Sequence, residues 1–245
     1  MARIGKIIAI LCTLVFLAAS FSFAAEEPAK IGSVLRLSIG SEHGIPAKRG
    51  VLMAVEEFNQ AGGLDGKKVE VIIEDEKDSP TAAVNSVKKL IDVNKVIALV
   101  GPMTSGDTLA SYKIADEAKV VFIPPPAPPP KVSGPSPYLF RGCSRIDVQA
   151  KALTDYIAKN LKPKTVGIFY SNEPYGKGCA KLFGEYFDKH GIKTVAKESF
   201  NRGDRDFKAQ LTKIKAAKPD ILFIPGYTPE TAPAAAQARQ LGMKQ

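Results

Sequence analysis

The stretch TVGIFYSNEPYGKGCAKLFGEYFDKHGIKTVAKES, residues 165–199, decides the fold class. Its short apolar run at 165–170 predicts a buried strand, the amphipathic segment 175–189 predicts a helix, and 193–199 predicts a second strand. Gly191 ends the helix, because glycine readily adopts the left-handed backbone that closes helices. Alternation of this kind is typical of a parallel sheet covered by helices, so the stretch predicts an α/β fold.

The same alternation extends over the rest of the chain from Val34. We expect further strands at 34–40, 68–74, 95–100, 119–123 and 220–224. We expect further helices at 47–61, 79–92, 105–117, 147–160, 204–217 and 229–241.

The alternation breaks once, at a proline-rich segment between Pro124 and Arg145. Six prolines fall within 124–130, and because proline lacks an N–H and fixes φ, this segment cannot be a helix or a central strand. We therefore predict two lobes, each a parallel sheet flanked by helices, with residues 25–145 in the first and 146–245 in the second. The second lobe has fewer expected strands than the five or so that sheets commonly carry, so we expect the chain to be truncated at its C-terminus.

The N-terminus carries the pattern of an export signal. Arg3 and Lys6 precede an apolar run over 7–19, and small residues follow at the positions that a signal peptidase reads. The run is shorter than the roughly 20 residues that span a bilayer, which disfavours a membrane anchor. We therefore interpret residues 1–24 as a cleaved signal peptide.

Composition excludes several classes of protein. The 245 residues are 45% hydrophobic and 24% charged, which is ordinary for a globular protein. The formal net charge is +9, but the lysines are scattered without a dense basic block, so we expect no binding to nucleic acid. The spacing of Cys143 and Cys179 matches no zinc or redox motif, and the sequence leaves open whether they pair.

No arrangement of residues predicts catalysis, a metal or a cofactor. Gly176-Lys177-Gly178 lacks the rest of a phosphate-binding loop, and no nucleophile with a partner base is visible. The acidic run at 74–78 could suggest a hard-cation site, but a polar strand end followed by a helix cap explains it better. We expect a protein that is not an enzyme.

Ligand binding is instead expected at loops that follow strands, because helix N-termini there present unpaired N–H groups. Three such loops carry hydroxyl or aromatic side chains: 101–106, 171–176 and 226–230.

Several short motifs in these loops and in the first predicted helix resemble one known family. They are Arg49-Gly50, Ala54-Val55-Glu56-Glu57-Phe58-Asn59, Gly62-Gly63, Gly101-Pro102, Thr104-Ser105-Gly106, Phe140-Arg141, Tyr175-Gly176, Gly226-Tyr227 and Pro229-Glu230. In this combination and order the sequence resembles the branched-chain amino acid (leucine/isoleucine/valine) binding proteins of ABC transporters, which have the type I periplasmic-binding fold. The resemblance implies two α/β lobes that close on a ligand.

The resemblance also implies where the ligand binds. The family's carboxylate-binding serine matches Ser105, and its aromatic positions in the second lobe match Tyr175 and Tyr227. The ligand-binding residues that we expect are His43, Met103, Thr104, Ser105, Gly106, Pro126, Ala127, Pro128, Tyr175 and Tyr227. Two of these depart from the family: His43 stands in place of a tyrosine, and Pro128 in place of the threonine that meets the ligand's ammonium group.

The function implied is a periplasmic binding protein that delivers a branched-chain amino acid, or a related small carboxylate, to a membrane permease. An aromatic or aliphatic carboxylate without the amine is the alternative ligand, because Pro128 offers no hydroxyl to an ammonium group. A signalling receptor whose ectodomain has the same fold is the alternative class of protein, and an enzyme on a doubly wound fold is a third.

Overall fold

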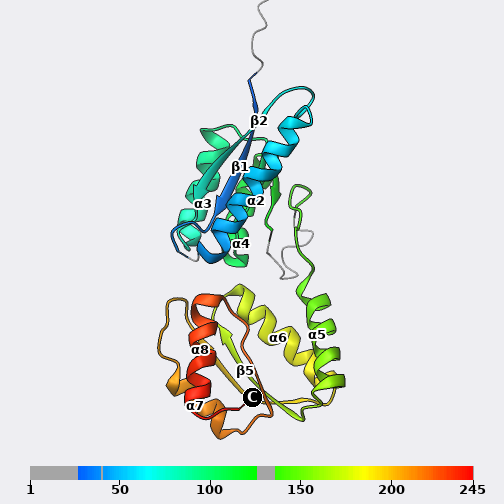
Figure 1. Ribbon diagram of the computed structural model, residues 1–245, viewed down its shortest axis with the longest axis vertical. Coiled ribbons are helices and arrows are strands. Elements are labelled where there is room, and N and C mark those ends of the chain that lie inside the picture. The colour runs from blue at the N-terminus through cyan, green and yellow to red at the C-terminus, as the bar shows by residue number, and fades with distance from the viewer. Residues whose placement is uncertain (1–26, 40, 126–135, 245) are drawn as a thin grey trace, which may run out of the picture.

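The computed structural model describes residues 27–39, 41–125 and 136–244. The described chain forms two lobes, and each is built on its own parallel sheet with helices on its faces (Figure 1). This is the α/β fold that the alternating sequence pattern predicts. Among the described residues, no helix is both long and apolar enough to cross a bilayer.

The first lobe contains a four-stranded sheet of order β2-β1-β3-β4. Its elements are β1 (Ala29–Leu35), α2 (Ser41–Gln60), β2 (Val69–Asp75), α3 (Pro80–Asp92), β3 (Ala98–Val100), α4 (Ser105–Glu117) and β4 (Val121–Ile123). A core that includes Val34, Leu90 and Phe122 fills the face beneath α3 and α4. On the other face, α2 packs less closely, and an apolar hollow of about 600 Å³ lies between it and β1.

The second lobe contains a three-stranded sheet of order β6-β5-β7. Its elements are α5 (Ile146–Asn160), β5 (Thr165–Ser171), α6 (Pro174–Lys189), β6 (Lys193–Phe200), α7 (Lys208–Ala216), β7 (Ile221–Phe223) and α8 (Thr228–Gln240). The central strand β5 is buried on both faces, because Ile168 packs under α5 and α6 whereas Phe169 packs under α7 and α8. An uninterrupted apolar run is typical of such a strand.

The bounds of the first predicted strand, 34–40, are wrong by five residues at each end. The strand runs from Ala29 to Leu35, because it pairs along its whole length with β2, from Ala29 opposite Val69 to Leu35 opposite Asp75. After Leu35 the chain leaves the sheet, and Leu37 N and Ser38 Oγ donate hydrogen bonds of 3.0 and 2.6 Å to the Asp75 carboxylate. The partner strand, rather than the local pattern, sets where β1 ends.

Two predicted helices also have different bounds. The helix expected at 47–61 begins at Ser41, so it reaches back toward the end of β1. The helix expected at 204–217 begins only at Lys208, because residues before it form a turn in which Asn201 N donates to Asp204 Oδ2. The boundary between lobes that we place at residues 145 and 146 stays a prediction.

Candidate functional site

A cleft of about 570 Å³ lies between the two lobes. Its lining combines residues that follow strands of the first lobe with residues of the second: Arg36, His43, Met103, Cys143, Gln149, Tyr175, Gly226, Tyr227 and Thr228. The carboxyl ends of both parallel sheets face it, which is where open α/β sheets bind ligands.

The structure places the residues expected from the sequence in three groups. His43, Met103, Tyr175 and Tyr227 line the cleft. Thr104, Ser105 and Gly106 lie at the start of α4 and are not part of the lining. Pro126, Ala127 and Pro128 lie outside the described residues.

The N-terminus of α4 is a preorganised donor group behind the cleft. Thr104 is the N-cap, and its side chain accepts a hydrogen bond of 3.1 Å from Asp107 N. Ser105 is fully buried, and its hydroxyl has no hydrogen-bond partner among the described residues. Its backbone N–H donates to Tyr227, so the tyrosine of the second lobe covers this helix end.

Tyr175 and Tyr227 form an aromatic wall of the cleft. Their ring centroids lie 5.4 Å apart at an interplanar angle of 32°. Burial raises the pKa of both phenols, so both hydroxyls stay protonated and can donate hydrogen bonds at neutral pH. The wall therefore offers flat apolar surface with polar tips.

Gly176 explains how Tyr175 reaches the cleft. A Cβ at Gly176 would collide with the Ser171 backbone carbonyl, so only glycine lets the first turn of α6 pack this closely on the end of β5. Gly176 is therefore explained by packing, and not as the remainder of a phosphate loop.

Arg36 is a cleft residue that the sequence analysis missed. It directly follows β1, only 3% of its side chain is exposed, and its Nη2 forms an ion pair of 2.7 Å with Asp78 Oδ1. Its guanidinium carbon lies 5.3 Å from the ring centroid of Tyr227 in the other lobe. Gly44 in the first turn of α2 packs on the Arg36 carbonyl, where a Cβ would collide. The sequence does show a charged residue within an apolar run at this point. The strand predicted at 34–40 placed Arg36 inside the sheet, so it was not considered as a ligand-binding residue.

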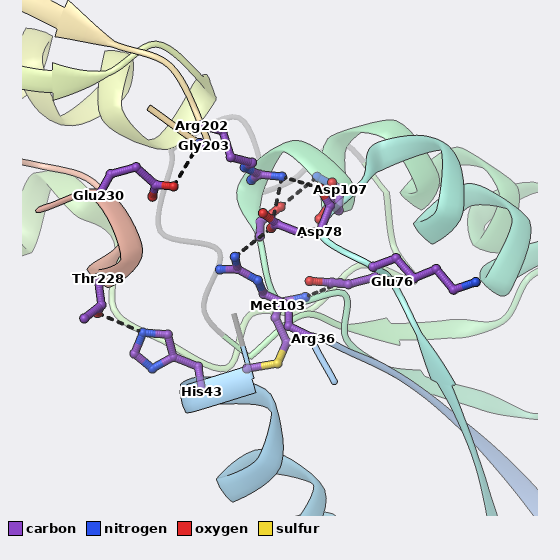
Figure 2. Close-up of polar contacts among 12 residues, drawn as sticks. Arg36, His43, Glu76, Asp78, Met103, Asp107, Arg202, Gly203, Thr228 and Glu230 are labelled. Carbon is purple, nitrogen blue, oxygen red and sulfur yellow. Dashed lines mark hydrogen bonds and ion pairs between the residues drawn. The ribbon is translucent and has the colours of Figure 1, made fainter. Parts of the chain in front are cut away.

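Arg36 belongs to a set of ion pairs that joins the lobes, called here the interlobe network: Arg36, Asp78, Glu173 and Arg202. Arg202 Nη1 lies 3.1 Å from Asp78 Oδ1 (Figure 2). Its Nη2 lies 2.7 Å from Glu173 Oε2. Burial acts against the charge on Arg202, but the nearby carboxylates outweigh it and raise its pKa. A second contact between the lobes joins His43 Nε2 and Thr228 Oγ1 at 3.2 Å.

Two buried carboxyl groups lie beneath this network on the side of the first lobe. Glu76 is fully buried and accepts a hydrogen bond of 3.0 Å from Met103 N. Burial, followed by the charge of Asp107, raises the pKa of Glu76 to about 8. Burial also raises the pKa of Asp107. Glu76 is therefore largely protonated near neutral pH and adds little negative charge to the site.

The acidic residues at 74–78 interact with separate partners and do not act as one cluster. Glu74 pairs with Lys89 at 2.7 Å, Asp78 pairs with the two arginines, and Ser79 caps α3. Across the described ranges, no three His, Cys, Asp or Glu side chains gather as metal ligands would.

Both described cysteines are free thiols, which answers the question that their spacing left open. Cys143 is partly exposed and lines the cleft. Cys179 lies on the buried face of α6, and burial raises its pKa to about 12, so it is an unreactive packing residue.

The geometry of two lobes around a cleft agrees with a family comparison. The model of a family described as periplasmic binding protein matches residues 28–245. The chain belongs to the periplasmic binding protein family. Two curated members are an amino acid binding protein of Pseudomonas aeruginosa, 36% identical over 197 residues, and the Leu/Ile/Val-binding protein BraC3 of Rhizobium johnstonii, 33% identical over 229 residues.

Solved structures of periplasmic binding proteins are similar over most of the described chain. The branched-chain amino acid transporter substrate binding protein LivJ of Streptococcus pneumoniae, in complex with isoleucine, has a TM-score of 0.82 at 36% identity, over 89% of this chain and 63% of that one. The leucine binding protein LivK of Thermotoga maritima has a TM-score of 0.83 at 32% identity, over 88% and 61%.

The curated relatives are longer than this chain. The alignment covers 80% of this chain and 52% of the Pseudomonas protein, and 92% of this chain and 62% of BraC3. The chain thus spans between about half and under two thirds of the length of these relatives.

Proposed function

We propose that this chain forms the ligand-capturing part of a periplasmic solute-binding protein of an ABC transporter, which binds a branched-chain amino acid or a related small carboxylate between its lobes. The observation that supports this most directly is the cleft, because its walls come from both lobes at the carboxyl ends of both sheets. The kinship to Leu/Ile/Val-binding proteins supports the amino acid.

The ligand's carboxylate is received at the N-terminus of α4, by the Ser105 hydroxyl and the N–H groups around it. A helix N-terminus favours an anion through its unpaired donors and its dipole. Tyr227 covers this end, so binding exchanges the tyrosine contact for a contact with the carboxylate. The rings of Tyr175 and Tyr227 then pack on the apolar part of the ligand.

Capture and release need no chemical step, so the protein acts as a carrier and not as an enzyme. Its partner is a membrane permease that accepts the ligand from the closed lobes. Residues 1–24 direct the chain to the periplasm, where the permease is reached.

A second candidate ligand is an aromatic or aliphatic carboxylate without the amine. The aromatic wall of Tyr175 and Tyr227 favours it, because offset stacking of rings is stabilising beyond the apolar area that is buried. The same carboxylate position at α4 serves both classes of ligand.

A thermal-shift screen against amino acids and their deaminated analogues, followed by calorimetry, tests this proposal on the protein expressed from its whole reading frame. We expect a small carboxylate to bind and Ser105→Ala to weaken it by about tenfold, the loss of one hydrogen bond to a charged group. Ser111→Ala is the control, because that serine is also buried on α4 but bonds to its own helix at the Asp107 carbonyl. Equal affinity in wild type and Ser105→Ala would show that the carboxylate binds elsewhere.

A further inference from the structure

We propose that Arg36 determines ligand specificity, by donating hydrogen bonds to a second oxygen-bearing group at the far end of the ligand. The ligand class is then a small carboxylate that also carries a second carboxylate or a carboxamide. This inference rests on the proposed binding function and narrows its ligands to the related small carboxylates in place of branched-chain amino acids, since a purely aliphatic side chain would not satisfy Arg36.

Arg36 has donors to spare on the side of the cleft. Its Nη2 is occupied by Asp78 at 2.7 Å, and its Nε is buried without a hydrogen-bond partner. Figure 2 shows the other terminal nitrogen directed away from Asp78, toward the side where His43 and Thr228 lie. A guanidinium carries five N–H donors in a fixed plane, so a single ion pair leaves most of them for another acceptor.

Among the described residues, Arg36 has one direct ion-pair partner, while the buried carboxyls of Glu76 and Asp107 lie near it without pairing. Its partner Asp78 is shared with Arg202, which has Glu173 as a further partner at 2.7 Å. Arg36 therefore holds one shared carboxylate, whereas Arg202 holds two.

The rest of the lining makes Arg36 the charged donor of the cleft. Among the described residues that line it, Arg36 alone carries a permanent charge. Met103, Tyr175 and Tyr227 supply apolar surface. The Arg36 side chain is buried, with only 3% of its surface exposed. A guanidinium that is this buried has little water to bond, so an apolar ligand would leave its free N–H groups without an acceptor, which is unfavourable. An oxygen of a carboxylate or amide would supply that acceptor.

The experiment compares ligands of equal chain length by isothermal calorimetry on the protein expressed from its whole reading frame. Glutamate, glutamine and norvaline form one set of five-carbon acids, and glutarate and valerate form a second set without the amine. We expect the ligands with a terminal oxygen group to bind at least tenfold more tightly than the aliphatic member of the same set. An aliphatic acid that binds as tightly as its oxygen-bearing counterpart would overturn the inference.

Variants then test whether Arg36 causes the preference. In Arg36→Met we expect the difference in affinity between the oxygen-bearing and the aliphatic ligands of each set to shrink to about twofold. The Asp78 carboxylate loses one of its partners in this variant. The double variant Arg36→Met with Asp78→Asn therefore repeats the test without that carboxylate. Arg49→Met on the exposed face of α2 is the matched control and keeps the full preference. Circular dichroism verifies the fold of each variant.

A preference that survives both Arg36 variants would exclude Arg36 as its cause. Aliphatic acids that bind in a Ser105-dependent way without any effect of Arg36 would overturn this inference alone. Failure of every acid to bind would overturn the proposed function, and the inference with it.

Discussion

Glu76 shows how a single side chain links the cleft to the stability of the first lobe. Its carboxyl group is fully buried, accepts from Met103 N and lies near the buried Asp107, so its proton is held more tightly in the folded state. Its pKa rises from an ordinary value of 4.5 to about 8. Between these two values the unfolded chain loses the proton while the folded chain keeps it. The free energy of unfolding contributed by Glu76 therefore falls as the pH rises through this window and levels off above about pH 8.

We predict that Glu76→Gln removes this pH dependence, because glutamine resembles the protonated acid and still accepts from Met103 N. Urea unfolding at pH 5.5 and pH 8.5 is the measurement. At the higher pH the variant is expected to be more stable than wild type by ~1–3 kcal/mol, with little difference at the lower pH. Glu70→Gln, at an exposed position on β2, the strand that ends just before Glu76, is the control. If the stability gap does not widen with pH, Glu76 is not protonated in the folded state.

Helix α6 shows how two glycines in one element can have opposite roles. At Gly176 a Cβ would meet the Ser171 backbone and hydroxyl, whereas at Gly178 it would meet nothing within 4 Å. The first glycine is required for the close approach of α6 to β5, which positions Tyr175 in the cleft. The second has no such constraint and costs the helix conformational entropy.

We predict that Gly176→Ala lowers the free energy of unfolding by ~2 kcal/mol or more, because backbone must shift to admit the methyl group. Gly178→Ala, two residues along the same helix, is expected to raise it by ~0.5–1 kcal/mol. Chemical denaturation of both variants gives the comparison. Similar effects of the two substitutions would mean that the close contact with Ser171 is not present in solution.

At the scale of the whole molecule, the interlobe network joins two separate cores. Arg202 of the second lobe bridges to Asp78 of the first, and it also donates to the Asp78 backbone carbonyl at 2.9 Å. Both arginines lie over Tyr227, at 5.3 and 5.8 Å from its ring centroid. These contacts exist only when the lobes are together, so they favour the closed arrangement relative to an open one.

We predict that Arg202→Met increases the radius of gyration in solution scattering and weakens ligand binding by about tenfold, because less of the protein is closed before binding. Arg205→Met is the matched control, since Arg205 lies in the same loop and its side chain donates to the Pro229 carbonyl of its own lobe. Scattering curves and affinities that match wild type in Arg202→Met would show that the network does not hold the lobes together.

The sequence by itself determined the elements and the fold class. In the described part of the chain, every helix and strand overlaps a predicted range, and the largest differences are at β1 and at the start of α2. The reason is that apolar periodicity and helix-end signals such as Gly191 are local properties, written in neighbouring residues. The motifs at 101–106 and 226–230 likewise lie next to the cleft because loops after parallel strands gather at one edge of a sheet.

The tertiary structure alone decided which of those residues face the cleft. Ser105 lies behind Tyr227, while Arg36, which looked like part of a strand, lines the cleft beside it. The interlobe network joins Asp78 to Arg202 across more than a hundred residues of chain. No local pattern encodes such contacts, because the position of each group is set by the register of β1 on β2 and by the packing of one lobe against the other.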